Sequence, residues 1–187
     1  MNWWNAVLPV VTLVLGSILA FWAESTRDSR AAKRADAERA AAQRARLLEE
    51  RRTFELETLQ ASGDAIARLA RASGRAHHFD VMSAKQAGTD RYVNFQLPPD
   101  ISDELFEANR ELARLEARNL EESTRTAISK LRSDVARLGV AADISVTEAE
   151  RLFRGLGSSA DEAQNLVSAR LRGIYEGSIV LKVPGDA

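Results

Sequence analysis

Hydrophobic and charged positions divide the chain into segments of different character. The first, Met1 to Ala23, contains no charged side chain, and its 21 residues from Trp3 onward would span about 31 Å as a helix. That length matches the roughly 30 Å hydrocarbon core of a bilayer. Trp3 and Trp4 lie at one end and Trp22 at the other, where indole rings favour the membrane interface. The pattern predicts a transmembrane anchor over residues 1–23.

A cleaved signal peptide and a buried core helix are the alternative interpretations of this segment. Signal peptides begin with basic residues and end at a cleavage site of small residues. Here no Lys or Arg precedes the apolar run, and cleavage after Ala23 would place the bulky Phe21 at the −3 position. Both features favour an anchor that is retained.

Basic residues indicate how this anchor is oriented. None precedes it, whereas five follow it within about 20 residues: Arg27, Arg30, Lys33, Arg34 and Arg39. Because positive charge stays inside, we expect the N-terminus outside and the C-terminal domain in the cytoplasm. Arg27, Arg30 and Arg34 are candidates for contact with lipid headgroups, although a solvated face that only sets topology is the simpler interpretation.

Residues 24–46 form a second segment, rich in Ala, Arg and Glu, without a large apolar side chain. Helix propensity and i,i+3 ion pairs such as Asp36 with Arg39 predict an exposed helical stalk. The sequence leaves open whether this helix is continuous, because each such pair contributes only ~0.2–0.5 kcal/mol.

Large apolar residues return at Leu47 and recur with helical spacing as far as residue 176, which predicts that packing begins there. The clearest stripe has the 4-3-4-3 spacing of a coiled-coil seam and comprises Ile101, Leu105, Ala108, Leu112 and Leu115. A second stripe comprises Ile128, Leu131, Val135 and Leu138 and ends near Gly139. The predicted start of the first helix is a cap at Asp100 or Ser102, and that of the second is a box formed by Asn119 and Glu122.

The last helical region has two signals that resemble capping boxes. Ser145 precedes Glu148, and Ser159 precedes Glu162. They predict two helical segments separated by residues 155–157, with one continuous helix over 145–176 as the open alternative. Gly177 fits a C-terminal cap, and residues 177–187 form a tail.

The segment Gly88 to Asp100 interrupts the helical periodicity and predicts a loop with an extended, partly buried stretch. Tyr92 and Phe95 in this loop have two interpretations. They contact a partner, or they cover the open end of the bundle, which is simpler because aromatic rings bury large areas. The predicted fold is therefore all-α, with an N-terminal transmembrane helix, a long helical stalk and a small antiparallel helical bundle over residues 47–176.

Small residues repeat every four positions within the predicted anchor, at Thr12, Gly16 and Ala20. Such a face allows two transmembrane helices to approach closely. It predicts either a homodimer or contact with another membrane protein, while the simpler interpretation is a face that meets only lipid.

Composition narrows the chemistry. The chain has 187 residues, with 26 Lys and Arg against 27 Asp and Glu, which excludes a globally basic nucleic-acid-binding protein. The absence of cysteine excludes disulfides, Cys-ligated zinc and a Cys nucleophile. His77 and His78 lie about 100° apart on a helix and, with Asp80, are poorly placed to share a metal ion. No phosphate-binding loop, nucleophile elbow or HExxH pair occurs, so we expect no enzyme activity, cofactor, metal or small-molecule substrate.

The run WWNAVLPVVTLVLGSILAFWAE followed by STRDSRAAKRADAERAAAQRARLLEERRTFELETLQ resembles uncharacterised bacterial single-pass membrane proteins. These have an N-terminal anchor, an Arg/Ala/Glu-rich helical stalk and a small helical domain. The likeness is architectural, covers residues 1–75 best and implies no activity. Stalk subunits of rotary ATP synthases look similar over the span and stalk, but the break at residues 88–100 departs from their continuous helix. Envelope-spanning phage lysis proteins would place the bundle outside, against the charge pattern.

These observations predict a non-enzymatic scaffold or adaptor at the cytoplasmic face of a bacterial inner membrane. The alternative is a signalling or regulatory subunit of a membrane complex, in which the stalk transmits a change between the span and the bundle.

Overall fold

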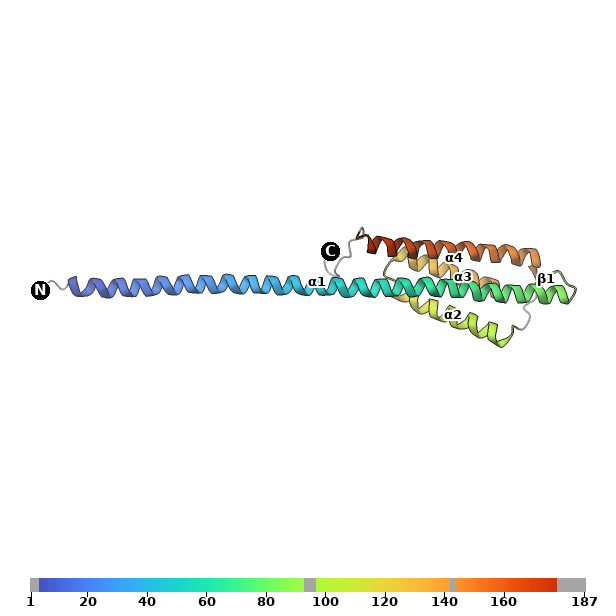
Figure 1. Ribbon diagram of the computed structural model, residues 1–187, viewed down its shortest axis with the longest axis horizontal. Coiled ribbons are helices and arrows are strands. Elements are labelled where there is room, and N and C mark those ends of the chain that lie inside the picture. The colour runs from blue at the N-terminus through green and yellow to red at the C-terminus, as the bar shows by residue number, and fades with distance from the viewer. Residues whose placement is uncertain (1–3, 93–96, 142–143, 178–187) are drawn as a thin grey trace. The chain divides into compact units, whose positions relative to one another are not determined.

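The computed structural model describes the backbone of residues 4–92, 97–141 and 144–177, and the side chains of those residues from 32 onward together with Trp22 and Arg27. These residues form helices α1 (Trp4–Gln86), α2 (Pro99–Arg118), α3 (Glu122–Gly139) and α4 (Val146–Tyr175), and strands β1 (Arg91–Tyr92) and β2 (Ile144–Ser145). The predicted all-helical fold is confirmed (Figure 1). The chain divides after Glu49 into two compact units.

The first unit contains the N-terminal part of α1. This helix runs without interruption through residues 24–46, which answers whether the predicted stalk helix is continuous. Its side chains from position 32 to 49 are exposed or half-exposed, and Arg39 pairs with Asp36 at 3.4 Å as expected. Because an exposed pair contributes only about 0–1 kcal/mol, the helix propensity of its Ala-rich sequence is the larger local influence.

Among the residues whose side chains are described, no helix has an apolar stretch long enough to cross a bilayer. The predicted anchor, residues 1–23, lies outside that set apart from the side chain of Trp22, which is 69% exposed.

The second unit is a four-helix bundle with up-down-up-down connections. α2 runs antiparallel to α1, because Asp100 at its start bonds Arg75 while Asn119, just after its end, bonds Ser62. α4 is antiparallel to α1 as well, since Arg170 near its end bonds Glu55. α3 packs against both α2 and α4, and ion pairs join it to each of them. These pairs are Arg132–Glu116 and Lys130–Glu162.

The core lies where the four helices meet and follows the predicted stripes. Ala108, Leu112 and Leu115 of α2 are buried, and all four predicted residues of the α3 stripe are buried. α1 and α4 complete the core with the buried side chains Leu59, Ile66, Leu69, Leu156, Ala163, Val167 and Ile174. Packing begins later than predicted, however, because Leu47 is exposed and the first buried side chain in the described part of α1 is Glu55.

Two predicted helix starts are wrong. α2 begins at Pro99, with Pro98 as its N-cap and no side-chain hydrogen bond, instead of at a cap formed by Asp100 or Ser102. Proline suits the first helical position because its φ is already helical and no N–H is needed there. α3 is preceded by Glu121, also without a capping bond. Asn119 is buried instead, and its amide donates to Ser62 Oγ at 2.9 Å and to the Leu115 carbonyl at 2.8 Å.

Residues 146–175 form one helix, so the predicted division into two segments is wrong. Ser145 is the N-cap as expected, and its hydroxyl accepts a bond from the Glu148 N–H at 3.1 Å. Ser159 does not cap a helix. It is buried inside α4, and its hydroxyl lies 2.7 Å from a carboxylate oxygen of Asp134 on α3. Gly155 and Gly157 each lower helix stability by about 1 kcal/mol relative to alanine. Burial of Leu156 between them, in the core, offsets this cost.

The chain leaves α1 at a left-handed glycine, Gly88, whose φ is +67°. The predicted extended stretch is present in part, because β1 pairs antiparallel with β2 and places Arg91 opposite Ser145. This pair holds the connection after α1 against the start of α4. Phe95 and the rest of residues 93–96 lie outside the described residues.

We expect Leu112→Ala to lower the free energy of unfolding by about 2–5 kcal/mol, because Leu112 is fully buried and truncation leaves a cavity. Phe106→Ala on the same helix is the control, since Phe106 is 63% exposed and should change stability little. Urea unfolding followed by circular dichroism measures both. Equal stability of Leu112→Ala and the parent would contradict the packing of α2.

Candidate functional site

A cavity of about 520 Å³ lies between α1, α2 and α3, at the end of the bundle where α2 begins. α2 opens this space, because its axis diverges from α1 toward Pro99 (Figure 1). Burial along its stripe follows the same trend. Ala108, Leu112 and Leu115 are buried, whereas Ile101 and Leu105 nearer the open end are only half-buried.

The α1 wall of the cavity is polar. Ser73, His77 and Asp80 recur at i, i+4 and i+7, so they share one helix face, and all three are buried. The hydroxyl of Ser73, a residue only 3% exposed, has no hydrogen-bond partner among the described residues. An unsatisfied buried hydroxyl costs about 1–3 kcal/mol, so Ser73 is unfavourable there unless something else bonds it.

His77 and Asp80 are fastened to β1 through Tyr92. The Tyr92 hydroxyl bonds the Asp80 carboxylate and lies 3.4 Å from Nδ1 of His77. Burial and the neighbouring carboxylate raise the pKa of Tyr92, so its hydroxyl stays protonated and donates. Burial lowers the pKa of His77, and its ring stacks on Phe153 of α4 with centroids 4.5 Å apart. The imidazole is therefore neutral near pH 7.

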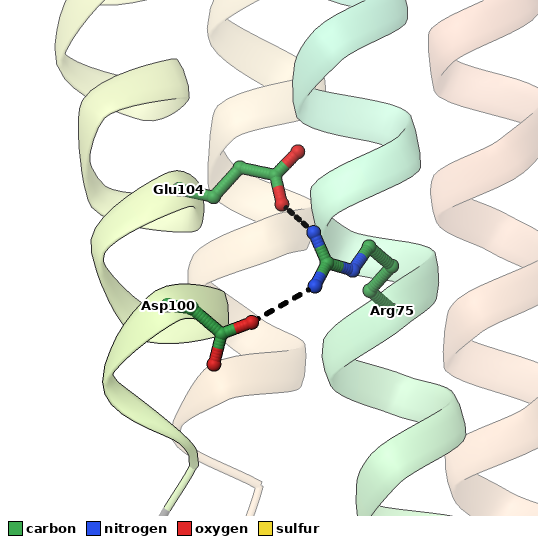
Figure 2. A network of polar contacts seen from close by, with 3 residues as sticks. All are labelled: Arg75, Asp100 and Glu104. Atoms are coloured by element: carbon green, nitrogen blue, oxygen red, sulfur yellow. Dashed lines mark hydrogen bonds and ion pairs between the residues drawn. The ribbon is translucent and has the colours of Figure 1, made fainter.

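An ion-pair network joins α1 to the start of α2 beside the cavity. Figure 2 shows Arg75 reaching from α1 toward two carboxylates of α2, Asp100 and Glu104. The bond to Asp100 is 3.0 Å long, and a second one goes to Glu104. Both pairs are largely exposed, so each contributes only about 0–1 kcal/mol.

A second polar cluster lies at the opposite end of the bundle. Glu55, 2% exposed, accepts a bond of 2.6 Å from Nε of Arg170, which also lies 3.6 Å from Glu121. The other carboxylate oxygen of Glu55 has no partner among the described residues. This cluster thus joins α1 to α4 by a buried but incompletely bonded ion pair.

Neither cluster is arranged for metal chemistry. Within the described residues, no group of three or more His, Cys, Asp or Glu side chains could hold a metal ion. His78 is exposed, whereas His77 is buried against Tyr92 and Phe153, so the two adjacent histidines face different surroundings.

The residues predicted as sites fall largely outside these clusters. Trp22, Arg27 and Arg34 are exposed, and the side chain of Arg30 lies outside the described residues. The same is true of the side chains in the transmembrane packing face (Thr12, Gly16 and Ala20) and of two interfacial anchors (Trp3 and Trp4). Tyr92 is 2% exposed and therefore faces the bundle, while Phe95 is not described.

Sequence reasoning named His77, Asp80 and Tyr92 but did not bring them together, and it missed Ser73, Asp103, Glu55 and Arg170. Ser73 and Asp80 occupy buried positions in phase with Leu69 and Ala76, and Glu55 is in phase with Leu59. A polar residue at a core position of an amphipathic helix is the signal that could have identified them. Arg170, which bonds Glu55, and Asp103, which lines the cavity, could not be assigned, because they come from other helices.

We expect Glu55→Ala to lower the free energy of unfolding by about 3 kcal/mol, because it leaves Arg170 without its closest carboxylate in a site shielded from water. The control is Glu111→Ala, which removes the exposed partner of Arg68 and should cost under about 1 kcal/mol. Urea unfolding at pH 7 compares the two variants. Similar losses of unfolding free energy in both variants would show that the Glu55–Arg170 pair stabilises the fold no more than an exposed pair does.

The lowered pKa of His77 predicts a pH effect on stability. Because the unfolded chain binds the proton more readily, the stabilising contribution of neutral His77 is complete above pH ~6.5 and is lost as the pH falls through the folded-state pKa. His77→Phe keeps an aromatic ring against Phe153 and should make stability depend less on pH in this range. His78→Gln, at an exposed position, should leave it unchanged. Thermal unfolding between pH 7.5 and 5.5 tests this, and an unchanged slope in His77→Phe would contradict it.

Comparisons with protein-family models, with curated proteins and with solved structures find no match to this chain. The function proposed below rests on the sequence and on the geometry described above.

Proposed function

We propose that the protein is a non-enzymatic scaffold or adaptor, anchored by residues 1–23 at the cytoplasmic face of a bacterial inner membrane. The observation that carries this proposal is the continuity of α1. One helix, Trp4–Gln86, contains nearly all of the uncharged run and also supplies buried positions from Glu55 to Ala84. The helix that contains the proposed anchor therefore also supplies one wall of the bundle.

The surface of the bundle supports a role in binding other proteins. Exposed ion pairs join its helices, including Arg68–Glu111 between α1 and α2. Several large apolar side chains are also exposed on its helices and their ends, among them Phe106, Val140 and Tyr175. Single exposed apolar residues are common on monomers, so they support contact with a partner only together with the anchor. Another membrane protein or a second copy of the chain, meeting Thr12, Gly16 and Ala20, is the proposed partner.

A regulatory subunit of a membrane complex is the second candidate, and the buried pair Glu55–Arg170 favours it. Glu55 lies on α1 where packing begins, and the pair joins α1 to α4. A rotation or shift of α1 relative to α4 would break this bond, so the pair is sensitive to the register of the two helices. Cysteines at Gln60 and Tyr175, whose long side chains bond at 3.3 Å, can be joined by a short bis-maleimide reagent and so report the register of the two helices in this Cys-free chain. A change in their cross-linking on stimulation would favour the regulatory function.

The anchored topology predicts the behaviour of fusions at Ala187. A fluorescent protein there should be bright and sediment with membranes, and alkaline phosphatase there should be inactive, because five basic residues follow the apolar run. The control is the same pair of fusions to a chain without residues 1–23, which should leave the membrane fraction. Active phosphatase with a dark fluorescent fusion would reverse the topology and contradict the cytoplasmic scaffold.

A further inference from the structure

The cavity between α1, α2 and α3 has two chemically different sides. Leu105, Val135 and Leu138 form an apolar side contributed by α2 and α3. Ser73 and Asp80 of α1 lie deep on the polar side, and Asp103 of α2 lies exposed at its rim. A volume of about 520 Å³ lies within the range of pockets that hold small organic molecules.

The charge of the lining selects among such molecules. The described lining residues include two carboxylates, Asp80 and Asp103, and no lysine or arginine. His77 is neutral because burial lowers its pKa, so it adds no positive charge. Arg75 lies beside the cavity, and its guanidinium already bonds Asp100 and Glu104 (Figure 2). The site therefore favours a cation over an anion.

Hydrogen bonding points to the same chemistry. The buried hydroxyl of Ser73 has no partner among the described residues and lines the cavity. A carboxylate accepts several hydrogen bonds, so Asp80 can accept from a ligand in addition to Tyr92. Acceptors thus predominate at the deep end, and a protonated primary amine, with three donors and no acceptor, complements them.

We infer that this cavity binds a small organic amine, with its ammonium group at Ser73 and Asp80 and its apolar body against Leu105, Val135 and Leu138. Asp103 at the rim attracts the cation and adds to selectivity over neutral compounds. This ligand site is separate from the proposed scaffold function, which needs no small molecule.

The test uses three probes with the same apolar body: 4-phenylbutylamine, 4-phenylbutan-1-ol and 4-phenylbutyrate. Isothermal titration calorimetry of the full chain in phosphatidylcholine nanodiscs measures binding, and empty nanodiscs correct for partition into lipid. We expect saturable binding of the amine, roughly tenfold weaker binding of the alcohol and none of the carboxylate, because charge-assisted hydrogen bonds are about twice as strong as neutral ones. Equal affinities for amine and alcohol, or no saturable binding, would overturn the inference.

Two variants locate the site. Asp103→Asn removes a rim charge without touching the Tyr92 network, and should weaken amine binding roughly threefold to tenfold while leaving alcohol binding unchanged. Asp161→Asn, at an exposed position of α4, is the matched control and should change neither. An equal effect of both variants would indicate general surface attraction and overturn the site. Leu105→Trp fills the cavity and should abolish binding of both compounds, with circular dichroism confirming that the variant is folded.

Discussion

The bundle depends on the packing of the other three helices against the buried face of α1. This face is apolar in the middle, where Leu59, Ile66 and Leu69 meet the α2, α3 and α4 stripes. Burial of a large aliphatic side chain contributes about 1.5–3 kcal/mol, more than any exposed ion pair in the molecule can supply. The short connections after α2 and after α3 then make consecutive helices antiparallel neighbours.

Polar residues interrupt this face at both ends, with different results. At one end Glu55 bonds Arg170 of α4 at 2.6 Å, so the interior contains an ion pair there. At the other end the helices diverge, and Ser73 and Asp80 border a cavity instead of a partner helix. The second case matches the burial along α2, where Leu112 and Leu115 near the end are buried while Ile101 near the start is only half-buried.

Periodicity predicted the helices better than it predicted their ends. The stripe on α3 is buried throughout because its spacing alone fixes one face of a helix. Ser145 and Ser159 have the same spacing to a glutamate, yet only Ser145 is a cap, because Ser159 bonds Asp134 of another helix. Asn119 likewise bonds Ser62 across the bundle. The cavity was not predictable, because it depends on the angle between helices, which no local pattern specifies.

The two ends of α2 are held with different strength. Toward its Arg118 end the helix contributes Leu112 and Leu115 to the core, and each fully buried leucine is worth several times an exposed ion pair. Toward Pro99 it is held by half-buried side chains and by the exposed bonds of Arg75. Local opening therefore costs least at the Pro99 end, since few apolar contacts would be lost there. A molecule bound in the cavity would add contacts at that end, so occupancy and the position of the first turns of α2 are physically linked.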